Sequence, residues 1–190
     1  MSIIDEVKKY LFKKIEEYKN SSADNYDFWN EHIKYVYEES IELAKKYNAN
    51  IEVVSLGALL HDIALICNVG DKKDHHINGE KLASQILDRF NYSGEMKERV
   101  LKCVYNHRSS KNAESVEELC VADADILAHF YNIPMVFHLA FNKQKVKFND
   151  AKTWIQDNFE KDYNDLSDRT KKIFEKKYRN ICEVILGKDY

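Results

Sequence analysis

The chain has very few residues that break helices. Its 190 residues include five glycines and one proline, and this scarcity of turn-forming residues favours long helices over many short strands. Apolar residues also recur at helical spacing. We therefore predict an all-α fold with helices over residues 2–19, 29–47, 51–67, 76–90, 95–108, 115–130, 134–142, 149–161 and 167–186.

The length and composition predict one domain over residues 1–190. A chain with 44% hydrophobic content can bury one sizeable core at this length. A C-terminal stripe of apolar residues at helical spacing predicts that the last helices pack on this core. The stripe consists of Phe174, Tyr178, Ile181 and Ile185.

Charge and cysteine usage give little sign of a macromolecular partner. A net charge of −3 lacks the basic excess typical of nucleic-acid binding, and the most apolar stretch, residues 53–67, is shorter than the roughly 20 residues that span a bilayer. The N-terminus lacks the pattern of a secretory signal. The widely spaced Cys67, Cys103, Cys120 and Cys182 suggest buried, reduced thiols. We expect a cytoplasmic protein, and the sequence leaves a homo-oligomer open.

Two ionisable residues lie in the middle of this apolar stretch. Within residues 53–67 only Ser55, His61 and Asp62 are polar, so the helix must be covered on nearly all sides. A buried carboxylate is costly unless it is paired or binds a metal. His61 and Asp62 therefore indicate either a divalent metal site or a His–Asp pair satisfied by neighbouring groups.

Further potential ligands occur on other predicted helices. They are His32, His75, His76, His107 and Asp125. Helical bundles build metal sites from such inward-facing side chains. Single histidines are more often structural or surface residues, and we interpret His129 and His138 in that way.

The order of these residues resembles the H…HD…D pattern of the HD superfamily of metal-dependent phosphohydrolases. Leu59-Leu60-His61-Asp62-Ile63 is similar to the family's L-L-H-D-[IV] helix. Residues 75–80 resemble an H-x-x-x-G-A element with Glu80 in place of the small residue. Residues 104–107 resemble [IV]-x-x-H, and residues 117–127 resemble T-x-E-A…D-A-D-R-L-D with Ile126 in place of arginine. The similarity covers about residues 28–140 and implies an HD-type helical bundle with additional C-terminal helices.

The resemblance implies a metal site formed by His32, His61, Asp62 and Asp125. Asp123 and Asp125 are separated by roughly 200° around a helix and cannot both face one metal. The family's ligand is followed two positions later by a large apolar residue, and Leu127 stands in that position after Asp125. Asp123 has several roles open to it: it holds a ligand histidine or a neighbouring loop, it is an alternative ligand, or it is an acid on the helix surface. His76 is likewise a candidate for a supporting residue or an alternative ligand.

The mixed nitrogen and oxygen ligands suit one or two ions of Mn, Fe, Co, Ni, Zn or Mg. Such an ion lowers the pKa of a bound water and polarises a phosphoryl oxygen, and Asp62 is expected to hold that water. His75 and His107 have two roles open to them. They either contact the substrate during catalysis or bind a second metal bridged by Asp62.

The expected activity is hydrolysis of a small phosphoester, and the resemblance suggests a nucleotide. Arg108 and Lys73 are candidates for binding its phosphate, and Lys72 beside Lys73 could also reach it, although all three also fit solvated loop residues. The same ligand order resembles di-iron members of the superfamily that are oxygenases. A third interpretation is a regulatory module that binds metal without turnover.

Overall fold

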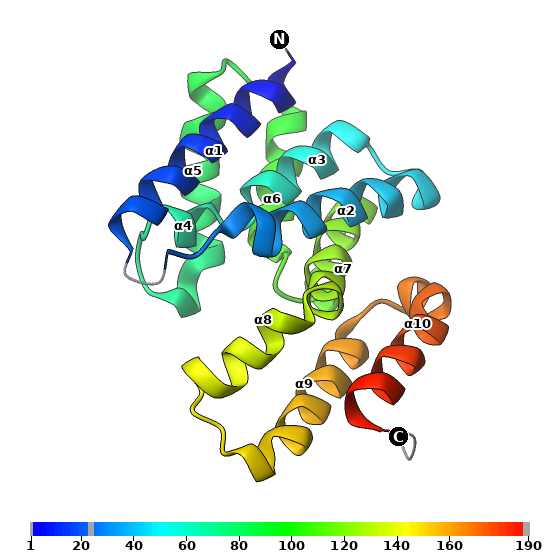
Figure 1. Cartoon of the computed structure of the whole chain (residues 1–190). Helices are drawn as coiled ribbons and strands as arrows, with labels where there is room; N and C mark the ends of the chain where they lie inside the picture. Colours follow the sequence, from blue (N-terminus) through cyan, green and yellow to red (C-terminus); the bar gives the residue numbers. More distant parts are fainter. Residues whose placement is uncertain (1, 23–24, 188–190) are drawn as a thin grey trace.

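The protein is described here by a computed structural model that covers residues 2–22 and 25–187, and every regular element within them is helical (Figure 1). The α-helices are α1 (Ile3–Ser21), α2 (Lys34–Tyr47), α3 (Ile51–Leu60), α4 (Ile63–Ile66), α5 (His75–Arg89), α6 (Glu95–Asn106), α7 (Val116–Tyr131), α8 (Ile133–His138), α9 (Ala151–Asp165) and α10 (Asp168–Leu186). Short π-helical turns are η1 (Trp29–Ile33) and η4 (Leu139–Lys143), and 3₁₀ turns are η2 (Lys72–Asp74), η3 (Ser110–Asn112) and η5 (Phe148–Asp150). The all-α prediction is confirmed.

One predicted helix is interrupted in the structure. The sequence predicted a continuous helix over 51–67, but α3 ends at Leu60 and α4 begins at Ile63. Asp62 leaves the helical conformation with φ −103° and ψ 16°. The chain therefore bends at His61 and Asp62, the two polar residues near the middle of the apolar run.

Helix α3 lies in the centre of the molecule. Every residue from Val53 to Leu60 is buried, and α3 contacts α1, α2, α6 and α7. The side chain of Asn50 begins the helix by accepting hydrogen bonds from the backbone N–H groups of Glu52 and Val53, which satisfies two otherwise unpaired donors. The largely apolar stretch from Val53 to Leu60 is stable here because other helices cover it.

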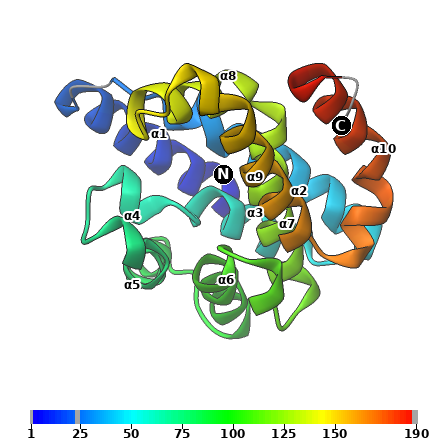
Figure 2. The same cartoon turned by 90° about the horizontal axis from the view of Figure 1, so that it is seen from below.

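Helices α8, α9 and α10 lie below the other helices in Figure 1, and Figure 2 shows α9 passing close to α7. An aromatic cluster joins them to α7, because the Phe130 ring lies 5.1 Å from Phe159, 5.2 Å from Phe174 and 5.7 Å from Tyr178. The predicted packing role of Phe174 and Tyr178 agrees with this arrangement. Among the described residues no helix has the length and apolarity needed to cross a membrane.

The carboxylate of Asp123 is a second link between α7 and α10. It accepts hydrogen bonds from Ser110 Oγ (2.6 Å), from the backbone N–H (2.9 Å) and Oγ of Ser167, and from Thr170 Oγ1 (2.6 Å). Asp123 is fully buried, so the interpretation as a helix-surface acid is wrong. The Asp123 carboxylate holds a neighbouring loop and the start of α10, because Ser110, Ser167 and Thr170 of these segments donate hydrogen bonds to it. The expectation that all cysteines are buried also needs correction, since Cys67 is only half-buried.

We expect Gly57→Ala to lower the free energy of unfolding by about 2 kcal/mol, the middle of the range for overpacked cores. An added Cβ at Gly57 would lie 2.6 Å from Cys103 Cβ, an atom fixed to the α6 backbone. At Gly79 the nearest atoms would be 3.3 Å and 3.4 Å away, so Gly79→Ala should cost less. Urea unfolding measures both, and a Gly57→Ala protein as stable as wild type would contradict this close approach of α3 and α6.

Candidate metal centre

Side chains from three parts of the fold form the first group of potential metal ligands. His32 lies in η1, His61 and Asp62 lie at the bend between α3 and α4, and Asp125 lies on α7. His32 Nε2 is 3.0 Å from Asp125 Oδ1, 3.1 Å from His61 Nε2 and 3.6 Å from Asp62 Oδ2. His61 Nε2 is 3.7 Å from Asp125 Oδ1. The structure thus brings together the four residues that the sequence assigned to one metal.

The other oxygen of Asp62 faces a second group. Asp62 Oδ1 lies 3.3 Å from His75 Nε2 and 3.8 Å from His107 Nε2. His75 begins α5 and His107 follows the end of α6. Two sets of ligand atoms are therefore close enough to hold an ion, His32–His61–Asp62 and Asp62–His75–His107, and they share Asp62.

The hydrogen bonds of the histidines show that this arrangement fits a metal. His75 Nδ1 lies 2.7 Å from the Lys72 carbonyl oxygen, and His107 Nδ1 lies 2.6 Å from the Val104 carbonyl oxygen. A carbonyl oxygen only accepts, so each Nδ1 carries the proton and a neutral ring has a lone pair at Nε2. The two Nε2 atoms are nevertheless 2.9 Å apart. Two lone pairs at this distance repel each other unless a cation, either a proton or a metal ion, lies between them.

His61 is oriented in the same way. Its Nδ1 donates to the Ala58 carbonyl oxygen at 2.8 Å, so its Nε2 lone pair faces His32. Backbone carbonyls that fix the tautomer of a histidine are typical partners of metal ligands. The donor set of imidazoles and carboxylates suits first-row divalent ions.

The charges at the centre favour the metal-binding forms of its residues. Burial opposes ionisation of Asp62, but the imidazoles of His61, His32 and His107 keep its pKa below the usual value. The pKa of Asp125 is also lowered, because burial is outweighed by the hydrogen bond from His32. Burial, followed by the neighbouring His61, lowers the pKa of His107 to about 4. The two carboxyl groups are thus ionised and His107 is neutral near pH 7.

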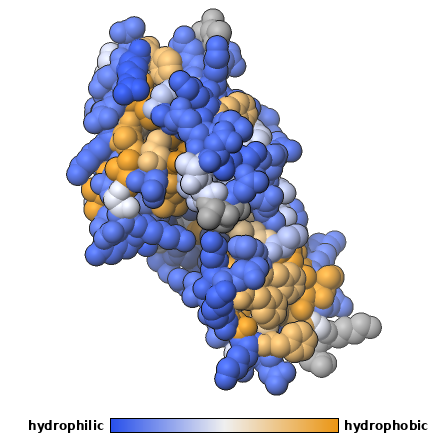
Figure 3. Space-filling view, turned by 60° about the vertical axis from the view of Figure 1, so that its left-hand side comes forward, coloured by the Kyte–Doolittle hydropathy of each residue, from blue (hydrophilic) through white to orange (hydrophobic). Residues whose placement is uncertain are grey.

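Five of the potential ligands line a cavity of about 810 Å³, namely His32, Asp62, His75, His107 and Asp125. In Figure 3 the surface is hollowed between the upper and lower parts of the molecule, and hydrophobic side chains gather on the lower part. A cavity of this volume is in the range that accommodates small-molecule ligands. The centre is therefore accessible to a substrate larger than a single ion.

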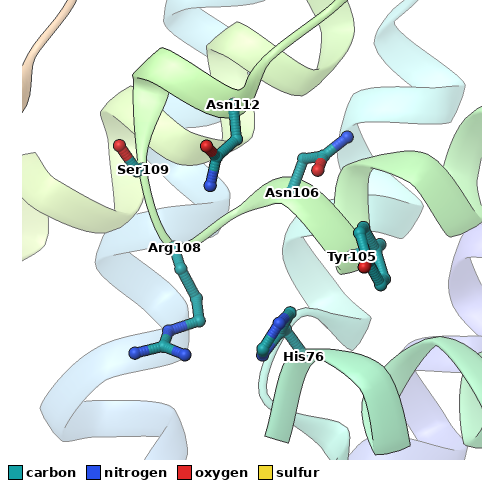
Figure 4. A pocket seen from close by; sticks show the side chains of 6 residues that line it. All are labelled: His76, Tyr105, Asn106, Arg108, Ser109 and Asn112. Carbon is teal, nitrogen blue, oxygen red and sulfur yellow. The ribbon is translucent and has the colours of Figure 1, made fainter. Parts of the chain in front are cut away.

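His76 does not join the centre. Its ring lies beside Tyr105, with ring centroids 5.4 Å apart, in a second cavity of about 510 Å³. Figure 4 shows the side chains of His76 and Arg108 at one end of this cavity and those of Asn106 and Asn112 at the other. His76 belongs to neither potential metal group in the described chain. The structure does not support His76 as an alternative ligand, because its ring packs against Tyr105 in the second cavity. Asp123, the other suggested alternative, is held by the serines and threonine described above.

The basic residues suggested for phosphate binding differ in position. Arg108 lines both cavities, and its guanidinium donates to the Lys73 carbonyl oxygen at 2.8 Å. The Lys73 side chain is exposed and lies 4.0 Å from Asp71, whereas Lys72 lines the larger cavity. The structure thus offers Lys72 rather than Lys73 beside the centre.

The sequence interpretation missed two histidines of the cavity wall. His129 and His138 both line the larger cavity, although no motif pointed to them. His129 follows Asp125 by four residues on α7, and residues at this spacing share a helix face, so helical spacing was a usable signal. His129 Nδ1 lies 2.9 Å from Asp162 Oδ2 of α9. Desolvation opposes the charged form, but the hydrogen bond and charge of Asp162 raise the pKa of His129 to about 9.

The comparisons with known proteins agree with this site. A model of the HD domain family matches residues 30–129, more than half of the chain. A solved structure of a predicted HD superfamily hydrolase from an uncultured Thermotogales bacterium is similar, with a TM-score of 0.58 and 22% sequence identity over 82% of this chain and 84% of that chain. At this identity the likeness shows the fold. No curated protein matches the chain significantly. The protein belongs to the HD domain family.

We expect Asp162→Asn to lower the pKa of His129 by about 1 to 3, the usual effect of removing an adjacent opposite charge. His129 in the wild type should stay protonated until the pH approaches 9. In the variant it should lose its proton nearer the ordinary value of about 6.5. An NMR titration of the histidine ring protons measures the difference. Identical titration of His129 in both proteins would show that Asp162 does not interact with it in solution.

Proposed function

We propose that the protein is a phosphohydrolase that uses two divalent metal ions bridged by Asp62 to cleave a small phosphoester, with nucleotides as the first class to test. The main support is the position of Asp62, whose two oxygens face two separate pairs of histidines at 3.3 Å to 3.8 Å. Membership of the HD domain family supports the hydrolytic reaction. The nucleotide class rests on the sequence resemblance alone.

His32, His61, Asp62 and Asp125 would hold one ion, and Asp62, His75 and His107 would hold the other. Manganese, iron, cobalt, nickel, zinc and magnesium remain candidates for these ligands. When bound, such ions lower the pKa of a coordinated water and neutralise charge on the phosphoryl group. The bridging carboxylate fixes the two positions relative to each other.

The burial and the hydrogen bond of His107 support one of the two roles that the sequence left open. A group that protonates a leaving oxygen needs a proton on the nitrogen that faces the substrate. His107 is buried, its pKa is about 4 and its single proton is at Nδ1, bound to the Val104 carbonyl. Its Nε2 has only a lone pair to offer. We therefore assign His107, and with it His75, as ligands of the second ion.

Basic side chains of the cavity wall, outside the metal centre, would bind the phosphate of the substrate. Arg108, Lys72 and His129 line the same cavity as the metal ligands. Arginine and lysine are frequent phosphate-binding residues, and the Asp162 carboxylate favours the charged form of His129. These cations line the same cavity as the two ionised carboxylates, Asp62 and Asp125.

An iron-dependent oxidation is the second candidate. The observation that favours it is the second pair of histidines, since a set of four histidines and two carboxylates also suits two iron ions. The two candidates differ in their need for oxygen. Hydrolysis proceeds without it, and the oxidation requires it.

The metal content of purified variants tests the ligand assignment. We expect two ions per chain in the wild type after incubation with Mn(II) or Fe(II), and one in His107→Ala, because that variant keeps the ligands of the first ion. Asp125→Asn should reduce the content further than the matched control Asp123→Asn, which changes the same residue type two positions away on α7. Elemental analysis gives the stoichiometry.

The control also has an effect of its own. Asp123→Asn should lower the melting temperature, because its carboxylate accepts four hydrogen bonds in a buried setting. It should nevertheless keep its metal. Equal metal content in His107→Ala and wild type would contradict the second site, and greater loss in Asp123→Asn than in Asp125→Asn would contradict the first.

Phosphate release from nucleoside mono-, di- and triphosphates and simple phosphoesters tests the reaction. We expect turnover by the Mn(II)-loaded protein in air and under nitrogen, and a decrease of at least about 100-fold in His107→Ala, as for loss of a catalytic group. The matched control is His138→Ala, a cavity histidine outside both metal groups. Turnover only with iron and oxygen would favour the oxidation. A metal-loaded protein without turnover of any of these compounds would contradict the hydrolase.

A further inference from the structure

The metal ligands form only one side of the 810 Å³ cavity. Aromatic and aliphatic side chains line much of the remainder, and they come from segments on both sides of the metal centre. They are Tyr18, Tyr26, Phe28, Leu65, Met135 and Leu139. A site for a bare phosphate needs no such wall, because its binding depends on charge and hydrogen bonds.

The first part of this wall is a packed aromatic corner. The Phe28 ring lies 4.9 Å from Tyr18 and 4.8 Å from Tyr26, both in edge-to-face geometry. Phe28 is buried, whereas the two tyrosines are half-buried. The corner immediately precedes η1, which carries His32. It is therefore held in place by the same segment that supplies a metal ligand.

The second part of the wall lines the same cavity. Met135 of α8 and Leu139 of η4 are four residues apart and both are half-buried. The Asn132 side chain amide ties this segment to η1, because it donates to the carbonyl oxygen of Glu31 at 2.7 Å and to its carboxylate at 2.9 Å. The two parts of the wall are thus fixed relative to each other and to His32.

Five of these six side chains lie outside the range that the family model matches. The family model matches residues 30–129, whereas Tyr18, Tyr26 and Phe28 precede that range and Met135 and Leu139 follow it. The metal ligands belong to the family's common part. Most of the apolar wall comes from residues on either side of that part, and Leu65 comes from within it.

We propose that the phosphoryl group of the substrate carries an apolar aromatic or aliphatic substituent, which binds between the Tyr26–Phe28 corner and the Met135–Leu139 segment while the phosphoryl group lies at the metal centre. This inference rests on the proposed phosphohydrolase function and specifies the substrate class. Apolar side chains that are half-exposed in a cavity bind a ligand by removing apolar surface of both partners from water. Each added methylene should then tighten binding by up to about fourfold until the space is filled.

The test is equilibrium binding of phosphonates, which resist hydrolysis, to the full-length Mn(II)-loaded protein by calorimetry. Methyl-, butyl-, hexyl- and phenylphosphonate share the anionic group and differ in apolar surface. We expect the wild type to bind hexylphosphonate at least about tenfold more tightly than methylphosphonate. Metal content is measured in the same samples.

Two variants and one control connect this selectivity to the wall. Leu139→Ser and Met135→Gln should each weaken binding of hexylphosphonate by about fivefold to tenfold and leave methylphosphonate and metal content unchanged. Val184→Ser, a matched loss of aliphatic surface at a residue of α10 that is 80% exposed, should change neither. Met135→Gln preserves the length of the side chain. This variant therefore still tests the apolar wall if Leu139→Ser folds poorly.

The possible results separate the two proposals. Equal binding of methyl- and hexylphosphonate by the wild type, or undiminished selectivity in both variants, would overturn the apolar substituent and leave the phosphohydrolase intact. Tighter binding of a nucleoside monophosphate than of hexylphosphonate, unaffected by either variant, would also overturn it, because the base would then bind elsewhere. Absence of binding of every phosphonate would contradict the proposed function itself.

Discussion

The structure of the centre depends on how the protons of a few imidazoles are fixed. His75 and His107 each direct the Nδ1 proton to a backbone carbonyl oxygen, so their Nε2 atoms, 2.9 Å apart, need a proton or a metal ion between them. Burial keeps the pKa of His107 at about 4, which prevents that ring from relieving the repulsion by taking up a proton near pH 7. Beside them lies the ionised carboxylate of Asp62. Placing these electron-pair donors so close together in a buried site is unfavourable unless positive ions neutralise them.

The rest of the fold holds these donors in position. The bend after α3 lets His61 and Asp62 reach different parts of the centre, and the central position of α3 makes the bend rigid. The π-helical turn η1 carries His32, and π-helical turns often occur at functional sites. Asp123 and the aromatic cluster around Phe130 fasten the C-terminal helices to α7. Helix α8, the turn η4 and the segment before η1 complete the cavity.

Much of the fold could be predicted because helical periodicity and the scarcity of glycine and proline are local signals. The potential ligands were also visible, since His61 and Asp62 interrupt an apolar run and an unpaired buried charge needs a partner. The bend at Asp62 could not be predicted, because the apolar pattern continues through it. The cavity role of His129 depends on Asp162, which is 33 residues away, and Asp123 depends on serine and threonine donors from distant segments. Such contacts arise only when the helices pack.

The central claim is that Asp62 bridges two divalent ions. It is tested most directly by anomalous diffraction from crystals of the Mn(II)-loaded protein, recorded near the manganese absorption edge. The account predicts two anomalous peaks separated by roughly 3.5–4 Å, the usual distance in two-metal sites. One peak should lie against His32, His61 and Asp125, the other against His75 and His107, with Asp62 between them. A single peak, or none, in fully metal-loaded protein would contradict it.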